Sequence, residues 1–430
     1  MNRYPLDQNV NFLGQTPLHL AVARPQYVQT LLEARHDLNA QDKHGITPLM
    51  YAAAQNQTDV VISLINAGAD IGRRDTLRKR SFLDYALARG HWDLVIRSLQ
   101  HIGNIYGTEG IDTAVQYVLI RLLKSMTLEA EERRNYFSRL LEMCENVNFI
   151  FGDSHLGVTE NNMLHYIQGR EDGNALVKAG FTGFNQKNSR GQLALMSQLT
   201  MHRLKAVKFC IENGTQVKHQ DNNGHTVLFP ALHNFCSSDK DRKSDDVEAV
   251  ILLLHSEADT LATDKCKCPC SPQGCFPAAL LSSKIGTLFG GDVVWTLEWL
   301  TLLEEHRSTK EAKTNLLSIL QRYIFDELEM MHVCCHKGSS SLSEFQNDLS
   351  QTEEDIREVQ EEEEELIAVL NNDMADLALE SYESLKKLWM QKIKGMYDAS
   401  ATKRKEKEQK ITDRPRVNNY SLHFWELALT

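Results

Sequence analysis

The sequence lacks a hydrophobic run long enough to cross a membrane. None of its apolar stretches approaches the roughly 20 residues that a bilayer-spanning helix needs. The first residues also lack the apolar core of a secretory signal. The formal net charge of −11 at pH 7 provides no general basic excess for binding nucleic-acid phosphates. We therefore expect a cytoplasmic or nuclear protein, with reduced thiols, that binds no membrane. Nucleic-acid binding is disfavoured, and the local basic segment Arg73–Arg80 is the one alternative for it.

Sequence signatures of common enzymes are also absent. The chain has no phosphate-binding Gly-x-x-x-x-Gly-Lys-Ser/Thr loop, no His-Glu-x-x-His helix, no Gly-x-Ser-x-Gly nucleophile turn and no dinucleotide fingerprint. Its sixteen histidines are dispersed along the chain. We expect no catalytic residues and no enzymatic activity. The alternative from another class is a metal-dependent enzyme that uses the cysteine cluster described below.

One segment recurs near the N-terminus. Gly14–Ala21 reads Gly-Gln-Thr-Pro-Leu-His-Leu-Ala, and Gly45–Ala52 repeats the pattern 31 residues later. Glycine permits the positive φ of a tight turn, threonine caps a helix by accepting hydrogen bonds from free N–H groups, and proline suits the first helical position. A second helix is predicted after each opening, at Tyr27–Glu33 and Asp59–Ala67, with Gly68 as a left-handed cap. Each unit is thus a predicted helical hairpin.

The Thr-Pro-Leu-His sequence at Thr16–His19 resembles the signature of the ankyrin repeat, a family with a period of about 33 residues. The resemblance covers roughly residues 10 to 305 and implies an all-α solenoid of about eight stacked units. It also implies a structural role for His19 and His165, which match the signature histidine and tie helix starts together. Weaker openings keep the register at Lys79, Gly110, Asn162, Gly191, Gly224 and Gly274.

Departures from this register divide the chain into five predicted regions. Residues 1–105 hold N-terminal ankyrin repeats, and 106–158 a divergent, stretched repeat. Residues 159–305 hold C-terminal ankyrin repeats with a cysteine-rich turn, in which a polar loop at Ser237–Asp246 lengthens the interval before the last unit. Residues 306–340 form a helical cap that ends in two cysteines, and 341–430 form a long amphipathic helical tail.

Four cysteines, Cys266, Cys268, Cys270 and Cys275, fall within ten residues of one another. Because alternate residues of an extended segment point the same way, the first three can share a face while the fourth returns after a turn. Such a set can bind a tetrahedral zinc ion. The spacing is not that of the common Cys-x-x-Cys pair, so one of the four is a candidate spectator and a distant residue a candidate ligand.

The distant candidates are Cys334 and Cys335, which follow a helix predicted at Asn315–Met330. This pair and the cluster resemble a group of fungal ankyrin-repeat proteins that carry Cys-x-Cys-x-Cys-Ser and Gly-Cys-Thr-Pro blocks and a late His-x-Cys-Cys; the chain departs from the pattern at Phe276. The resemblance supports pairing the two segments. We predict a structural zinc site that pins the C-terminal helices onto the last repeat, with redox-sensitive or buried thiols as the alternatives. A closed ligand shell would leave no position for a catalytic water.

A basic segment, Arg73–Arg80, lies in the finger between the second and third repeats. Its five positive charges can receive an acidic peptide or a phosphate, although a solvated loop is the simpler interpretation. Helix positions beside this finger are expected to line the concave face of the array, where tyrosine and arginine are favoured interface anchors. The partner-binding candidates, for another protein of unknown identity, are Tyr51, Gln55, Arg74, Arg78, Asp84 and Tyr85.

The tail after Ser341 has apolar residues at alternating steps of three and four, which predicts an amphipathic helix. Two arrangements remain open. The stripe either forms a coiled-coil hairpin that turns near Asn371–Asp373, which would allow a homodimer, or packs back on the array as a cap. Capping is the simpler interpretation because the terminal repeat of an array needs a cover.

Overall fold

The computed structural model describes residues 10–107, 111–125, 128–153, 157–237, 243–267, 271, 273–282, 291–328 and 353–392. Helices dominate these residues, which confirms the predicted fold class. The strands found there are one short antiparallel pair, β1 (Phe151–Asp153) with β2 (Val158–Asn161), which the sequence analysis did not predict. No helix in the described ranges combines the length and apolar character needed to cross a bilayer.

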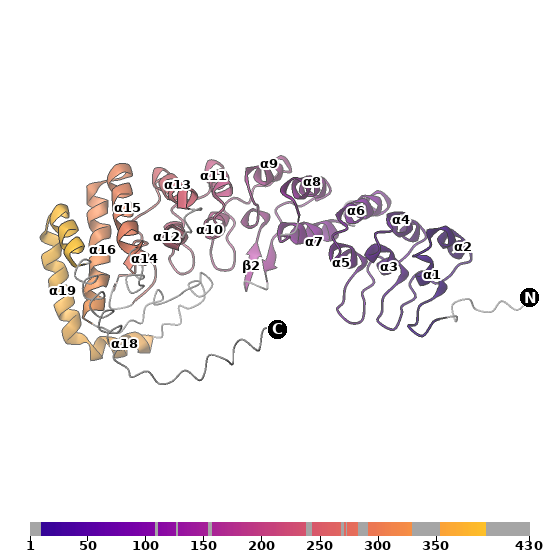
Figure 1. Cartoon of the computed structure of the whole chain (residues 1–430), viewed down its shortest axis with the longest axis horizontal. Helices are drawn as coiled ribbons and strands as arrows, with labels where there is room; N and C mark the ends of the chain where they lie inside the picture. The colour runs from indigo at the N-terminus through magenta and orange to yellow at the C-terminus, as the bar shows by residue number, and fades with distance from the viewer. Residues whose placement is uncertain are drawn as a thin grey trace, which may run out of the picture. The chain divides into compact units, whose positions relative to one another are not determined.

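The chain divides into two compact units. The first comprises residues 1–198 and 203–215, and the second comprises residues 199–202 and 216–430. In the first unit, α1, α3 and α5 form one row and α2, α4 and α6 a second row, with the loops projecting beside the first row (Figure 1). The elements of this unit, with α10 ending just beyond it, are α1 (Pro17–Ala21), η2 (Pro25–Tyr27), α2 (Val28–Glu33), α3 (Pro48–Ala54), α4 (Thr58–Asn66), α5 (Phe82–Leu87), α6 (Trp92–Tyr106), α7 (Asp112–Leu123), α8 (Ala130–Leu141), η3 (Met163–His165), α9 (Arg170–Lys178), α10 (Ala194–Thr200) and α11 (Leu204–Glu212).

Apolar side chains from both rows of helices form the core of the first unit. Leu18, Ala52 and Ala86, from the first helices of successive repeats, are fully buried, as are Leu64 and Leu99 from the second helices. Each hairpin therefore buries its apolar faces against its neighbours, as expected of stacked repeats.

The loops that join one repeat to the next, which we call fingers, share a hydrogen-bonding pattern. In four of them, the Oδ1 atom of an Asp or Asn accepts the backbone N–H groups two and four residues further on. For Asp42 these are the N–H groups of His44 and Ile46, at 2.8 and 2.9 Å. The same pattern holds at Asn11, Asn188 and Asp221. A short polar side chain thus satisfies the backbone of each turn.

Backbone hydrogen bonds also join neighbouring fingers. The N–H of Lys43 donates to the carbonyl of Leu13, and the N–H of Thr76 donates to the carbonyl of His44, each at 3.0 Å. Close approach is needed for this contact, because a Cβ atom placed on Gly45 would lie 2.6 Å from the Thr76 nitrogen. Gly45 also has a φ of 74°, so its position requires glycine for two reasons.

The signature histidines have the structural role expected of them. The Nδ1 atom of His19 accepts the N–H of Thr16 at 3.1 Å, so its Nε2–H donates to the carbonyl of Ile46, at 2.9 Å. His165 makes the same pair of contacts with the N–H of Asn162 and the carbonyl of Gln192. One imidazole therefore links a helix start to the backbone of the next repeat. The prediction that threonine caps the helix holds at Thr47, which accepts from a backbone N–H, whereas the Thr16 hydroxyl contacts the His19 ring.

The second unit continues the helical hairpins and ends in longer helices. Its helices are α12 (Leu228–Ser237), α13 (Lys243–His255), α14 (Ala279–Ser282), α15 (Gly291–His306), α16 (Thr309–Glu327), α18 (Glu353–Glu362), α19 (Glu364–Leu379) and a helix over residues 382–392. Two predicted boundaries were wrong. Helix α13 begins at Lys243, inside the predicted polar loop. Asp245 and Asp246 stabilise this start because their negative charges lie at the positive end of the helix dipole. Helix α16 begins at Thr309, six residues before the predicted start at Asn315.

The described part of the tail packs against α16. Leu370, Leu385 and Trp389 are fully buried, and the Tyr382 hydroxyl donates to the carboxylate of Glu304. These contacts favour the cap over the coiled-coil hairpin. The turn predicted at Asn371–Asp373 was wrong, because α19 runs through it without interruption. The predicted homodimer remains a prediction.

Two glycine substitutions separate the cost of the left-handed backbone at Gly45 from the cost of its close approach to Thr76. Gly68 has a φ of 92°, but a Cβ added there would meet nothing within 4 Å, so Gly68→Ala should cost only the left-handed backbone strain, about 1 kcal/mol. Gly45→Ala should cost about 2 kcal/mol more, because its Cβ must push the Thr76 backbone away. Urea unfolding of the two variants measures this difference; equal losses would contradict the finger contact.

Burial of His165 predicts a loss of stability in acid. Desolvation lowers the pKa of His165 from 6.5 to about 4, outweighing its backbone hydrogen bonds. Its neutral form therefore contributes stability that is fully present above pH 6.5 and is lost as pH falls toward 4, about 3 kcal/mol in total. Urea unfolding between pH 7 and 4.5 should show a shallower pH dependence in His165→Gln than in the wild type. His44→Gln, at an exposed position, should leave it unchanged; an unchanged slope in His165→Gln would refute the assignment.

Candidate functional site

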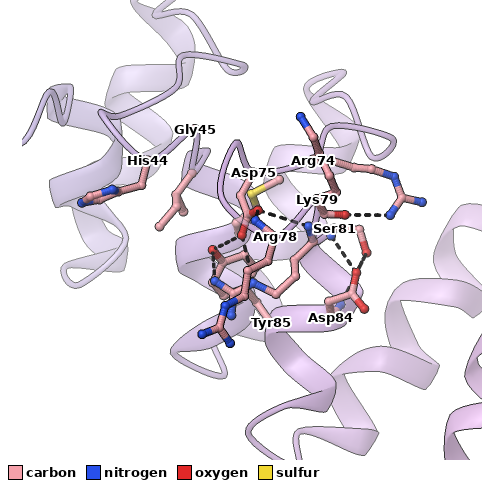
Figure 2. Close-up of polar contacts among 12 residues, drawn as sticks. His44, Gly45, Arg74, Asp75, Arg78, Lys79, Ser81, Asp84 and Tyr85 are labelled. Atoms are coloured by element: carbon pink, nitrogen blue, oxygen red, sulfur yellow. Dashed lines mark hydrogen bonds and ion pairs between the residues drawn. The ribbon is translucent and has the colours of Figure 1, made fainter. Parts of the chain in front are cut away.

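The basic finger predicted to bind a partner is organised around one buried carboxylate, that of Asp75. Its Oδ1 atom accepts the backbone N–H groups of Arg78 and Arg80, at 2.7 and 3.2 Å. Its Oδ2 atom accepts from the Tyr85 hydroxyl at 2.8 Å and from Nε of Arg80 at 2.9 Å (Figure 2). Asp75 therefore joins the finger to the first turns of α5.

Arginine and tyrosine complete this cluster. The Arg80 guanidinium lies over the Tyr85 ring, with its Cζ 4.3 Å from the ring centroid, and its Nη2 donates to the Tyr85 hydroxyl at 2.9 Å. Burial raises the pKa of Asp75, but hydrogen bonds from Arg78, Tyr85 and Arg80 lower it more, so it lies well below its usual range. Burial and the hydrogen bond to Asp75 raise the pKa of Tyr85 to about 12. The carboxylate is therefore ionised and the phenol neutral near pH 7.

The preceding repeat holds Tyr51 in the same way. Its hydroxyl donates to Oδ2 of Asp42 at 2.9 Å and accepts from Nε2 of Gln15 at 2.6 Å. The His19 ring meets the Tyr51 ring edge-on, with centroids 5.5 Å apart. Two of the predicted partner-binding residues, Tyr51 and Tyr85, are thus half-buried, and both hydroxyls are fixed by the aspartate of their own finger.

The remaining predicted partner-binding residues differ in their contacts. Gln55, Arg74 and Arg78 are exposed. The Arg74 guanidinium donates to the carbonyl of Lys79 at 2.9 Å, which holds it along the finger (Figure 2). Asp84 is half-buried, and its Oδ2 accepts from the N–H and the hydroxyl of Ser81, so its carboxylate completes the start of α5.

One residue of this surface escaped the sequence analysis. The hydroxyl of Tyr117, on α7, donates to Oδ1 of Asp84. Burial and this hydrogen bond raise the pKa of Tyr117 to about 12. The contact links the stretched fourth repeat to the third. The repeat period would have indicated Tyr117, since it lies 32 residues after Tyr85, close to the length of one repeat.

The second candidate site is the cysteine-rich turn in the second unit. Cys266 and Cys275 are buried, and their Sγ atoms and a carboxylate oxygen of Asp264 lie within 4.8 Å of one another. Two ligands of a tetrahedral zinc ion at about 2.3 Å stand about 3.8 Å apart, so this spacing suits a shared ion. The three residues form a group that can hold a metal ion.

Asp264 was missed as a member of this group, although it occupies the aspartate position of its finger. Its Oδ1 accepts the N–H groups of Cys266 and Cys275, at 2.9 and 2.7 Å. In the Asp42 finger the second N–H comes from the residue four positions after the aspartate. In this finger seven extra residues are inserted, so the second N–H comes from Cys275, eleven positions after Asp264. Oδ1 is therefore committed to the turn, which makes Oδ2 the candidate metal-binding oxygen. Oδ2 also lies 3.9 Å from Nε2 of His225.

Four of the predicted zinc ligands, Cys268, Cys270, Cys334 and Cys335, lie outside the described residues. The predicted pairing of the two segments therefore stays a prediction. The three remaining cysteines differ in burial. Cys210 is fully buried in α11, whereas Cys144 and Cys236 are half-buried.

Comparison with known proteins identifies the N-terminal repeats. Residues 2–75 match the family model described as Ankyrin repeats (3 copies). This segment contains the openings at Gly14 and Gly45 and the fingers of Asn11 and Asp42. Residues 2–75 are thus similar to ankyrin repeats, a class whose stacked units generally bind other proteins.

Three curated relatives share limited parts of this chain. "Ankyrin repeat and SAM domain-containing protein 6" of Rattus norvegicus is 44% identical over 68 residues, 15% of this chain and 8% of the relative. XBOS31 of Oryza sativa subsp. japonica, named for E3 ubiquitin-protein ligase activity, is 36% identical over 78 residues, 18% of each chain. ZDHHC13 of Danio rerio, named for palmitoyltransferase activity, is 22% identical over 203 residues, 46% of this chain and 29% of the relative. The matched regions span less than a third of each relative, so the activities in their names belong to those proteins.

Removing one hydroxyl tests the Asp75 cluster. Tyr85→Phe deletes the donor to the buried carboxylate, and we expect a loss of about 1 kcal/mol in the free energy of unfolding. The matched control, Tyr27→Phe, removes the hydroxyl of a residue that is more than half exposed, and should change stability little. Urea unfolding at pH 7 compares them. Equal stability in both variants would mean that the Tyr85 hydroxyl does not hold the finger.

Proposed function

We propose that this protein is a non-enzymatic interaction module that recognises another protein through the first helices and fingers of its N-terminal repeats. Six residues form the proposed contact surface. They are Tyr51, Gln55, Arg74, Arg78, Asp84 and Tyr85. The observation that carries this proposal is the anchoring of both tyrosines by finger aspartates.

Anchoring of this kind favours binding. A side chain that is already fixed loses little rotamer entropy when a partner covers it, and each immobilised side chain otherwise costs about 1 kcal/mol. The hydrogen bonds of Tyr51 to Asp42 and of Tyr85 to Asp75 leave the rings half-buried at the surface. Rigid tyrosines next to exposed arginines are the residue types most enriched among interface anchors.

Charge reversal of the finger tests this proposal. Affinity capture from the native cells should recover a partner with the wild-type chain, and recovery should fall strongly with Arg74→Glu plus Arg78→Glu. The control reverses two exposed cations on other helices, Arg134→Glu plus Lys178→Glu, and should not reduce recovery. Equal recovery by both double variants would reject this surface.

We also propose that the cysteine-rich turn holds a structural zinc ion. Two buried thiols and one carboxylate oxygen provide three zinc-binding atoms in a single finger. The ion would close the inserted loop between Cys266 and Cys275, where the other fingers need only their aspartate. Candidate further ligands are Cys268, Cys270, Cys334 and Cys335. A structural ion, rather than a catalytic one, fits a turn whose backbone is already satisfied by Asp264.

Elemental analysis of protein purified without added metal tests the zinc site. We expect about one zinc per chain in the wild type and in Cys144→Ser, and loss of zinc in Cys266→Ser and Cys275→Ser. Chelation should unfold the second unit, because metal binding is coupled to folding at structural sites. A wild-type protein without zinc would overturn the proposal. Zinc that leaves on gentle chelation without unfolding would favour the metal-dependent enzyme instead.

A further inference from the structure

Two columns of exposed side chains follow the repeats along the first helices of the first unit. Leu20, Tyr51, Tyr85 and Tyr117 occupy equivalent positions on α1, α3, α5 and α7, at intervals of 31, 34 and 32 residues. All four are exposed or half-buried. The hydroxyl of Tyr117 donates to Asp84 on α5, so the column extends as far as α7.

The second column follows the first by four residues, just beyond the C-terminal ends of α1, α3 and α5 and within α7. Its members are separated by the same repeat intervals of 31, 34 and 32 residues. They are Arg24, Gln55, Arg89 and Arg121, and all four are exposed. A column of apolar and aromatic groups therefore runs beside a column with three arginines.

The carboxylates beside these columns are already engaged within the fold. Asp42 and Asp75 are buried and each accepts hydrogen bonds from its finger and from a tyrosine. Asp84 accepts from Ser81 and Tyr117. None of these contacts involves the arginines of the second column, and Arg74 and Arg78 add positive charge from the finger. The surface thus has positive charge to offer to a partner.

We propose that this surface binds an extended acidic peptide with a carboxylate at about every third residue. Packed helices lie about 8–10 Å apart. A peptide in the extended polyproline II conformation advances about 3.1 Å per residue and has about three residues per turn, so residues three apart share a face and span one repeat. One acidic side chain can then meet each arginine, with an apolar neighbour on each ring of the first column. Gln55 interrupts the arginine column, so a peptide carboxylate at that position meets an uncharged amide. This inference rests on the proposed function and specifies the chemistry of the partner.

Two fluorescein-labelled peptides test the periodicity. The first is a 12-residue peptide with glutamate at positions 1, 4, 7 and 10, leucine after each glutamate and serine elsewhere. The second has the same composition with its four glutamates in one block. Fluorescence anisotropy with the full chain should show the periodic peptide binding about tenfold tighter, since each charged hydrogen bond contributes about 1.5–3 kcal/mol. Equal binding of the two peptides overturns the proposal.

Substitutions assign the binding to the arginine column. Arg89→Gln plus Arg121→Gln should weaken the periodic peptide about tenfold or more, whereas Arg134→Gln plus Lys178→Gln should not. Circular dichroism melting confirms that both variants fold. Equal weakening by the two variants would place the peptide elsewhere and reject the site.

Two outcomes separate this inference from the proposed function. Capture of a partner that depends on Arg74 and Arg78, with no binding of the periodic peptide, overturns only the acidic-peptide inference. A third labelled peptide carries residues 353–370 of this chain, which include the run Glu361–Glu365. Tighter binding of this peptide than of the periodic one would also overturn the inference, because the occupant would then be a second copy of the chain.

Discussion

The structure of the repeats depends on one hydrogen-bonding device, the side-chain oxygen of an Asp or Asn that satisfies the backbone of each finger. Asp42, Asp75 and Asp264 each use Oδ1 for two backbone N–H groups. These hydrogen bonds fix the conformation of the finger, so that the neighbouring finger can donate a backbone hydrogen bond to it. A carboxylate in this position has a second oxygen, Oδ2. It accepts a tyrosine hydroxyl in the N-terminal fingers and is the candidate metal-binding oxygen of Asp264.

The two sites differ in what meets that second oxygen. In the N-terminal repeats a tyrosine donates to it, which holds an aromatic ring half-buried beside exposed arginines. In the cysteine-rich finger two thiols lie within 4.8 Å of a carboxylate oxygen of Asp264, because the inserted residues place Cys266 and Cys275 at the positions whose N–H groups bind Oδ1. One turn geometry thus supports a recognition surface in one place and a metal-binding group in another.

Local sequence patterns predicted much of this. Glycine, threonine and proline at fixed spacing predicted the register, since each restricts the backbone by itself, and the signature histidines followed from it. Contacts between residues far apart in the sequence have no such local pattern and were not predicted. Asp264 was not recognised as part of the metal-binding group, and the Tyr117 hydroxyl reaches Asp84 from the next repeat. Helix α19 continues through Asn371–Asp373 because burial of Leu370 outweighs weak local helix propensity.

Backbone hydrogen exchange in variants of Asp75 tests the central claim most directly. Asparagine retains an oxygen at Oδ1, as Asn11 and Asn188 do in their own fingers, whereas alanine retains none. The account predicts slow exchange at the N–H groups of Arg78 and Arg80 in the wild type and in Asp75→Asn, and fast exchange in Asp75→Ala. Equally slow exchange in Asp75→Ala would show that the finger is held without this side chain and would contradict the account.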